Sequence, residues 1–510
     1  MDERREIEEN NPAEETSEQS FAPYSPVTGN ARKPEKLKFG TKEWIILAAA
    51  LAASLYPAFC LKLTFIFENG FPGVGSALFL LAVEAFGIYV IGKNGQWTKG
   101  NLFMLASGAV CALTLGISSS YAVRALNHLA SFVFIAIGLL CASGMNRFPL
   151  TRAAVLWESF VNTFSALFGH FFKPFSGISN SLGGKKKGVL GVILGIAVCV
   201  PLLAVVIALL SSADVSFSAF LEEINEKLGG LSFEDVIARG IGIVFYTLVF
   251  FSIFFSLARP KNVMRRDPHA PAIPESAFIT VLAVLAVVYM VFLGVQVDAL
   301  FGGSKTAIDA GGYAYYARDG FFQLVVVSAI NLAAVMAAQY SQGEHRGVRV
   351  FCMVLCVLTA LLLASAVWRM CLYIKVYGLS FLRFMTFYAM AVIACADVLC
   401  AVKAFKPECR MFSPLLICAV GLWVLFTLAP CRIISDYNVN AFLSGKVEQV
   451  DVYYLSSLSP SAVPSLRRLA DAGNADAARV LKEIEEDSGR FCDYMYPDCP
   501  WYIWSADMIK

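Results

Sequence analysis

The residues best suited to bind or activate a ligand lie in one short stretch of this chain. Arg369, Tyr373 and Tyr377 recur at every fourth position, so a helix would carry all three side chains on one face. Gly378 suits the left-handed position that ends such a helix. Arg383 follows shortly afterwards. The stretch therefore predicts a tight turn between two helices, with an arginine on each side of it.

Guanidinium groups match the planar oxygens of phosphate and carboxylate, so these arginines predict an anion site. The site that we expect combines three arginines with two tyrosines: Arg318, Arg369, Tyr373, Tyr377 and Arg383. Its ligand would be a small anion or a lipid head group. The alternative is that the arginines reach toward lipid phosphates while the tyrosines join an aromatic belt at the membrane surface. The sequence leaves both interpretations open.

Long apolar runs surround this turn and fill most of the chain. Charged residues make up 16% of the sequence, against about 25% in soluble proteins. A bilayer-spanning helix needs roughly 20 apolar residues. Eleven runs approach or exceed that length: 43–63, 73–92, 101–118, 121–141, 188–211, 238–258, 276–298, 320–340, 350–368, 381–403 and 412–430. Because backbone groups in lipid must bond within their own segment, we predict an all-α integral membrane protein with about eleven transmembrane helices.

The connections between these runs alternate between rich and poor in Lys and Arg. Positive charge stays on the cytoplasmic side, so the N-terminus is predicted to be cytoplasmic and the C-terminal tail extracytoplasmic. Four regions follow: a disordered cytoplasmic leader (1–42), a four-span unit with a cytoplasmic amphipathic connection (43–187), a seven-span core (188–430) and a small soluble α-helical module (431–510). Segments 152–172 and 215–232 are amphipathic and too polar to be confident spans.

A few ionisable side chains fall inside the predicted spans: Glu84, Arg124, His128 and Asp397. A charge at mid-bilayer costs several kcal/mol unless it is paired or hydrated, so each is a candidate functional residue. Glu84 is expected to pair with Arg124 or His128, either to fix the order of the helices or to line a proton or ion pathway. Asn331 and Gln339 are expected to form hydrogen bonds between helices.

Two cysteines, Cys492 and Cys499, lie in the tail that the topology places outside the cytoplasm. That compartment permits disulfides, and the loop between the two thiols is short and turn-prone. The alternative is a pair of unbonded thiols packed near Trp501 and Trp504.

No recognisable motif assigns an enzymatic activity or a cofactor. The Gly-rich stretch before Lys185 lacks the spacing of a phosphate-binding loop, and four His in the whole chain argue against a His-rich metal site. Neither a cofactor nor a nucleic-acid partner is expected, and membrane lipid is the expected surrounding.

Three stretches resemble the signatures of uncharacterised bacterial multispan proteins: Arg369–Arg383 with its Tyr-Gly-Leu-Ser turn, Tyr316–Leu324, and Asp451–Ser459 followed by Ala462-Val463-Pro464. The proteins that this chain resembles are catalogued as domain of unknown function 4173, with the related 4153 group. The resemblance implies a bacterial cytoplasmic (inner) membrane and brings no activity with it.

Two main functions remain open from the sequence, beside a membrane-embedded transferase for lipid-linked substrates, for which Asp298, Asp309 and Asp319 match no recognised spacing. The first is a non-enzymatic multispan protein that senses, binds or scaffolds at its extracytoplasmic face. The second is a secondary transporter for a small, anionic solute, which should show polar groups converging at mid-depth.

Overall fold

The computed structural model describes residues 38–60, 73–181, 206, 210, 233–261, 274–301, 321–342, 345–447 and 449–493. Within these ranges, side chains are not described at 233–237, 296–301, 321, 342 and 485–493. Every regular element in the described part of the chain is a helix. The all-α prediction is confirmed for those residues.

The first group of long helices contains α1 (Thr41–Cys60), α3 (Val74–Ile91), α4 (Lys99–Ile117), α5 (Tyr121–Ser143) and α10 (Phe233–Ala258). Helices α1 and α10 pack antiparallel, because Gly242 near the start of α10 lies against Ala58 near the end of α1. Phe251, Phe254 and Phe255 fill the centre of this group and are almost fully buried.

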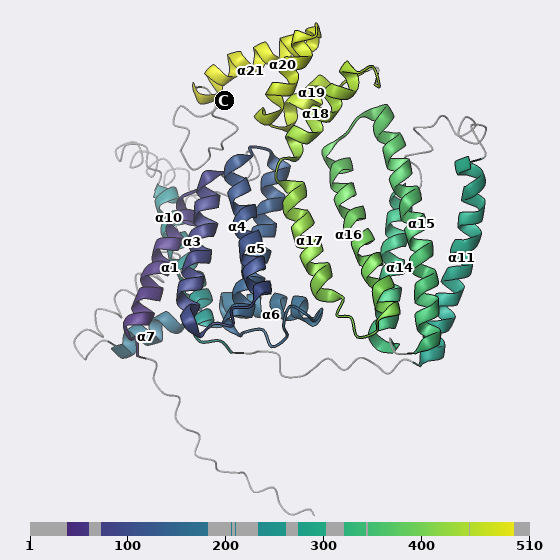
Figure 1. The fold of residues 1–510 in the computed structure, drawn as a ribbon. Coiled ribbons are helices and arrows are strands. Elements are labelled where there is room, and N and C mark those ends of the chain that lie inside the picture. Colours follow the sequence, from purple (N-terminus) through teal and green to yellow (C-terminus); the bar gives the residue numbers. More distant parts are fainter. Residues whose placement is uncertain are drawn as a thin grey trace, which may run out of the picture.

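The second group contains α11 (Glu275–Phe301), α14 (Phe321–Gln342), α15 (Arg346–Tyr377) and α16 (Phe381–Phe405). Helix α17 (Phe412–Thr427) stands between the two groups and contacts both α4 and α16 (Figure 1). Trp423 on α17 donates a hydrogen bond to Asn127 of α5 over 3.1 Å, which ties α17 to the first group inside the apolar region.

Nine of the described helices are long and apolar enough to cross a membrane, or ten if α17 and the following α18 count as one broken span. Only residues 206 and 210 of the predicted span 188–211 are described, and the amphipathic segment 215–232 lies outside the described residues. The predicted span 412–430 ends in a bend of 61° between α17 and α18. Pro430 occupies the first turn of α18, where its missing N–H costs nothing.

Short helices follow the bend: α18 (Pro430–Leu443), α19 (Val452–Leu458), the 3₁₀ turn η2 (Pro460–Ala462), α20 (Val463–Asp471) and α21 (Ala475–Asp493). They lie together at one end of the long helices (Figure 1). We call this set the terminal module. The sequence also predicts two short helices at 462–471 and 474–486, joined at Gly473, and both are present as α20 and α21.

The opposite end of the long helices carries α6 (Ala154–Phe168) and α7 (Lys173–Ser181), as Figure 1 shows. The near-helical spacing of apolar residues in the amphipathic segment 152–172 also predicts a helix, and α6 is present there. Phe39, just before α1, is close to Gly177 of α7, and its N–H donates to Ser181 Oγ at 2.7 Å. This fixes the start of α1 at the α6–α7 end.

Candidate functional site

The turn between α15 and α16 forms as its residues predict. Gly378 takes the positive φ of +72°, and its N–H donates to the carbonyl of Ile374 at 2.8 Å. Ser380 caps the start of α16 by accepting a hydrogen bond from the N–H of Arg383. Two helices therefore end and begin within three residues, and the N–H and carbonyl of Leu379 between them have no helical partners.

Arg383 folds back over this turn toward the end of α15. Its guanidinium lies 4.2 Å from the centre of the Tyr373 ring and donates to the carbonyls of Tyr377 and Gly378. The rings of Tyr373 and Tyr377 meet edge to face at 5.0 Å. A cation is favourable at a helix C-terminus and over an aromatic face, so Arg383 stabilises the end of α15 in two ways.

The other two predicted anion ligands are placed differently. Arg369 lies on α15 and is only 7% exposed, so it points into the packed interior. Arg318 lies outside the described residues. The structure thus brings together Tyr373, Tyr377 and Arg383, and the binding of an anion by the full set stays a prediction.

The backbone of the turn is bonded by side chains from the terminal module. Asn438 on α18 donates from Nδ2 to the Leu379 carbonyl and accepts from the Leu379 N–H at Oδ1, each at 2.7 Å. Tyr454 on α19 accepts a hydrogen bond from the N–H of Phe381, also at 2.7 Å. Burial raises the pKa of the Tyr454 hydroxyl, so this group stays protonated at neutral pH. We call these three contacts the turn clamp.

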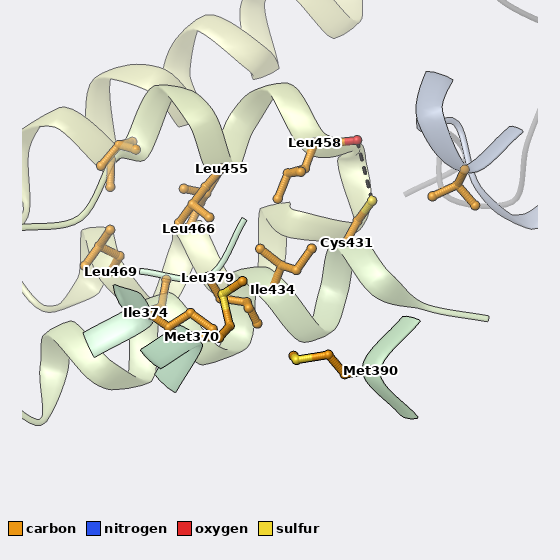
Figure 2. Close-up of a cluster of buried hydrophobic side chains, with 14 of the residues drawn as sticks. Met370, Ile374, Leu379, Met390, Cys431, Ile434, Leu455, Leu458, Leu466 and Leu469 are labelled. Carbon is orange, nitrogen blue, oxygen red and sulfur yellow. Dashed lines mark hydrogen bonds between the residues drawn. The ribbon is translucent and has the colours of Figure 1, made fainter. Parts of the chain in front are cut away.

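A single apolar core surrounds the turn clamp. Met370, Ile374 and Leu379 from the turn region pack with residues of the terminal module (Figure 2). The module contributes Cys431, Ile434, Leu455, Leu458, Leu466 and Leu469, all less than a tenth exposed. The Cys431 thiol also lies 3.7 Å from the Leu458 carbonyl, holding α18 against the end of α19. The terminal module is therefore joined to α15 and α16 by a continuous interior.

Sequence reasoning missed Asn438, because nothing local marks one Asn in a mixed helix as a partner for a turn 59 residues earlier. The available signal was the Asp-Val-Tyr-Tyr-Leu stretch. Asp451 caps α19 by accepting from the Tyr454 N–H at 2.9 Å, and this cap positions the Tyr454 ring toward Phe381. Two of the three family-like stretches thus contact one another.

A second set of polar groups lies inside the α14–α15–α16 interface. Asn331 donates to Thr359 at 3.3 Å, and Gln339 donates to the Cys400 carbonyl at 2.8 Å, which confirms the predicted hydrogen bonds between helices. Asp397 lies beside Cys356 and is 6% exposed. One oxygen of each of Asn331, Gln339 and Asp397 is buried without a hydrogen-bond partner among the described residues.

The predicted pair in the first group of helices does not form among the described residues. Glu84 is buried on α3, and its Oε2 has no hydrogen-bond partner there. Arg124 instead donates from Nε to the Ser118 carbonyl at 2.7 Å, which closes the connection between α4 and α5. Asn127, one turn further along α5, donates to Thr114 at 2.6 Å and so links α5 to α4.

The predicted disulfide is not described. Only the backbone of Cys492 is placed, in α21, and Cys499 lies outside the described residues.

Comparison with known proteins identifies the family of this chain. A family model described as a domain of unknown function (DUF4153) matches residues 102–469, from α4 to α20. No curated protein and no solved structure matches the chain. The resemblance to the 4153 group is thus confirmed, and the closer relation to 4173 stays a prediction. Because the match covers well over half of the chain and its helices are of membrane-spanning length, this is a multi-pass membrane protein of the DUF4153 family.

Proposed function

We propose that this chain is a non-enzymatic protein of the bacterial cytoplasmic membrane that senses, binds or scaffolds through its terminal module. The observation that carries the proposal is the turn clamp with its shared core. A module joined to α15 and α16 by buried contacts cannot shift without moving the ends of those helices. Binding at the module would thereby reach the membrane-spanning region.

The distribution of charge supports a cytoplasmic α6–α7 end and an extracytoplasmic terminal module. Many basic residues border the α6–α7 end: Lys42, Lys93, Lys99, Arg147, Arg152, Lys173, Arg259, Lys261, Arg346, Lys403, Lys406 and Arg410. Few border the other ends of the long helices, among them Lys375 and Arg383. Positive charge is retained on the cytoplasmic side, so this asymmetry favours a cytoplasmic N-terminus.

Labelling with a membrane-impermeant maleimide tests this arrangement. A cysteine introduced by Ala472→Cys on the terminal module should react in intact spheroplasts. One introduced by Arg346→Cys at the start of α15 should react only after permeabilisation, and the unmodified chain sets the background. The opposite pattern would place the module in the cytoplasm and reject an extracytoplasmic role.

A second function, secondary transport of a small anionic solute coupled to protons, is favoured by the polar set inside α14–α15–α16. Asn331 and Gln339 are separated by about 12 Å along α14, at 1.5 Å per residue. Asp397 lies on the facing helix, and the three unpartnered oxygens are all acceptors. A proton on Asp397 would supply a missing donor, and intramembrane carboxylates that take up and release protons form the proton relays of pumps and transporters.

Proton movement into proteoliposomes, followed with an enclosed pH dye, separates the two functions. Transport predicts proton uptake that Asp397→Asn abolishes and that Asp471→Asn, an exposed control on α20, leaves intact. Absence of proton movement in the wild-type protein, with and without phosphate or acetate as test anions, would leave the first proposal standing.

A further inference from the structure

A pocket at the α6–α7 end gathers three arginines from two separate loops. It is lined by Arg147, Phe148, Pro149, Thr151, Arg152 and Arg410. We propose that this pocket binds the phosphate group of an anionic phospholipid. It lies at the opposite end of the molecule from the turn clamp, so the proposal is independent of the function proposed above.

The loop that carries two of the arginines is held rigidly. Glu158 on α6 is completely buried, and its carboxylate accepts the N–H groups of Arg147 at 2.8 Å and Phe148 at 2.9 Å. Asn162 donates to the Met145 carbonyl at 3.0 Å, just before the loop. These bonds fix the backbone of the loop.

The third arginine is brought close by packing between the two loops. Phe148 and Leu150 are buried in a cluster that includes Phe412 and Leu416 at the start of α17. Arg410 directly precedes α17, in the connection from α16. The pocket therefore joins the two groups of helices at this end of the molecule.

The charge of the pocket calls for an anion. Arg152 lies 5.8 Å above the Phe148 ring, and neither Arg152 nor Arg410 forms an ion pair with any residue that the structure describes. Arg152 and Arg410 line the same pocket, and the forked donors of their guanidinium groups match phosphate oxygens. The Thr151 hydroxyl adds a neutral donor to the lining.

Helix α6 shows the depth at which the pocket lies. Its polar residues Glu158, Ser159 and Asn162 are buried against the protein, whereas Trp157 and Phe160 are more than half exposed. Phe164 and Phe168 continue the same exposed aromatic face. A helix that turns its aromatic side away from the protein fits the boundary between lipid head groups and acyl chains. The arginine loop leads directly into α6, which places it at the depth of lipid phosphates.

Lipid binding to the full-length protein tests the proposal. Native mass spectrometry in detergent would follow titration with phosphatidylglycerol, phosphatidylcholine or inorganic phosphate. The test variant is Arg152→Gln with Arg410→Gln. The matched control, Arg346→Gln with Lys403→Gln, also removes two positive charges at this end of the molecule but lies outside the pocket.

We expect wild-type protein to retain phosphatidylglycerol in preference to phosphatidylcholine. The test variant should bind phosphatidylglycerol at least about tenfold more weakly, because hydrogen bonds to charged groups commonly contribute that much affinity. The control should change binding by less than about twofold, as is usual for solvent-exposed charges. If both variants weakened phosphatidylglycerol binding equally, the binding would come from general electrostatic attraction of the lipid to this end of the molecule and not from the pocket. Displacement of the lipid by inorganic phosphate would assign the pocket to a soluble anion. Either result overturns the proposal.

Discussion

The side-chain amide of Asn438 forms two hydrogen bonds with the backbone of Leu379, one to the N–H and one to the carbonyl, each at 2.7 Å. Leu379 lies in the turn between α15 and α16, where its backbone has no helical partner. Its side chain is buried, so unbonded polar groups there would be costly. The amide of Asn438 thus completes the turn and at the same time attaches α18 to it.

Replacement of Gly378 by alanine should weaken this attachment. The combination of φ +72° and ψ 177° costs an alanine about 1–3 kcal/mol. The added Cβ would also lie 2.6 Å from Asn438 Oδ1, so the amide must move. Gly445→Ala is the matched control, because Gly445 has a φ of +69° and open space around its Cβ position.

Thermal unfolding in detergent, followed by tryptophan fluorescence, measures the difference. Gly378→Ala should lower the unfolding temperature clearly more than Gly445→Ala. Equal decreases in unfolding temperature would mean that the positive φ alone sets the cost of the alanine, and that contact with Asn438 adds nothing to it.

Removal of the Tyr454 hydroxyl should also destabilise the module. Tyr454→Phe leaves the N–H of Phe381 without its acceptor, at a cost of about 1–2 kcal/mol. Tyr453→Phe is the control on the same helix, because that ring is 56% exposed. Limited proteolysis should cleave the terminal module, which follows Thr427, faster in Tyr454→Phe than in the control. Indistinguishable rates would argue against a bond to Phe381.

Arg383→Lys should not behave as a conservative change. A lysine cannot lay a planar group over Tyr373 while donating to two carbonyls, so a loss of about 1 kcal/mol is expected. Arg432→Lys is the control, since Arg432 forms only an exposed pair with Asp436. Unfolding temperatures compared with and without added phosphate would report any bound anion as well. A silent Arg383→Lys variant would indicate that the side chain merely reaches toward the lipid surface.

Stability should depend on pH through His170, in the turn between α6 and α7. Burial, with Lys173 and Lys261 nearby, lowers the pKa of this imidazole from 6.5 to about 4. Its Nδ1 lies 2.9 Å from Ser256 Oγ. Between these pH values the unfolded chain binds the proton and the folded chain does not. The free energy of unfolding should therefore fall as the pH drops from 6.5 toward 4.

His170→Gln removes this contribution, so its unfolding temperature should decline less steeply than that of wild-type protein over the same pH range. His345→Gln, beside Glu275 at the start of α15, is the control for loss of a histidine elsewhere. Parallel curves for wild-type and His170→Gln proteins would contradict the assignment.

Much of the fold follows from local sequence. Apolar length predicts the long helices, and the caps at Gly378 and Ser380 place the turn to the residue. Asn331 and Gln339 bond between helices because a polar group in an apolar interior has few other partners.

The contacts between segments that are distant in the chain could not be predicted from local sequence. The pairing of Asn438 with Leu379 depends on the bend after Thr427, which turns α18 across the ends of α15 and α16. The expected pairing of Glu84 with Arg124 or His128 is not found among the described residues, where one bond of Arg124 runs to the Ser118 carbonyl. Periodicity predicts the helix at α6, but the burial of its polar side depends on the loop that Glu158 bonds.

Amide hydrogen exchange across residues 378–384 in the full-length protein tests the turn clamp most directly. The N–H groups of Leu379 and Phe381 should exchange slowly in the wild-type protein, because Asn438 and Tyr454 bond them. Asn438→Ala should speed exchange of the Leu379 amide by a factor of about ten or more, given a cost of 1–3 kcal/mol for an unbonded buried group. Asn440→Ala, at an exposed position of the same helix, should leave it unchanged. Rapid exchange at Leu379 in the wild-type protein, or equal exchange in both variants, would contradict the attachment of the terminal module to this turn.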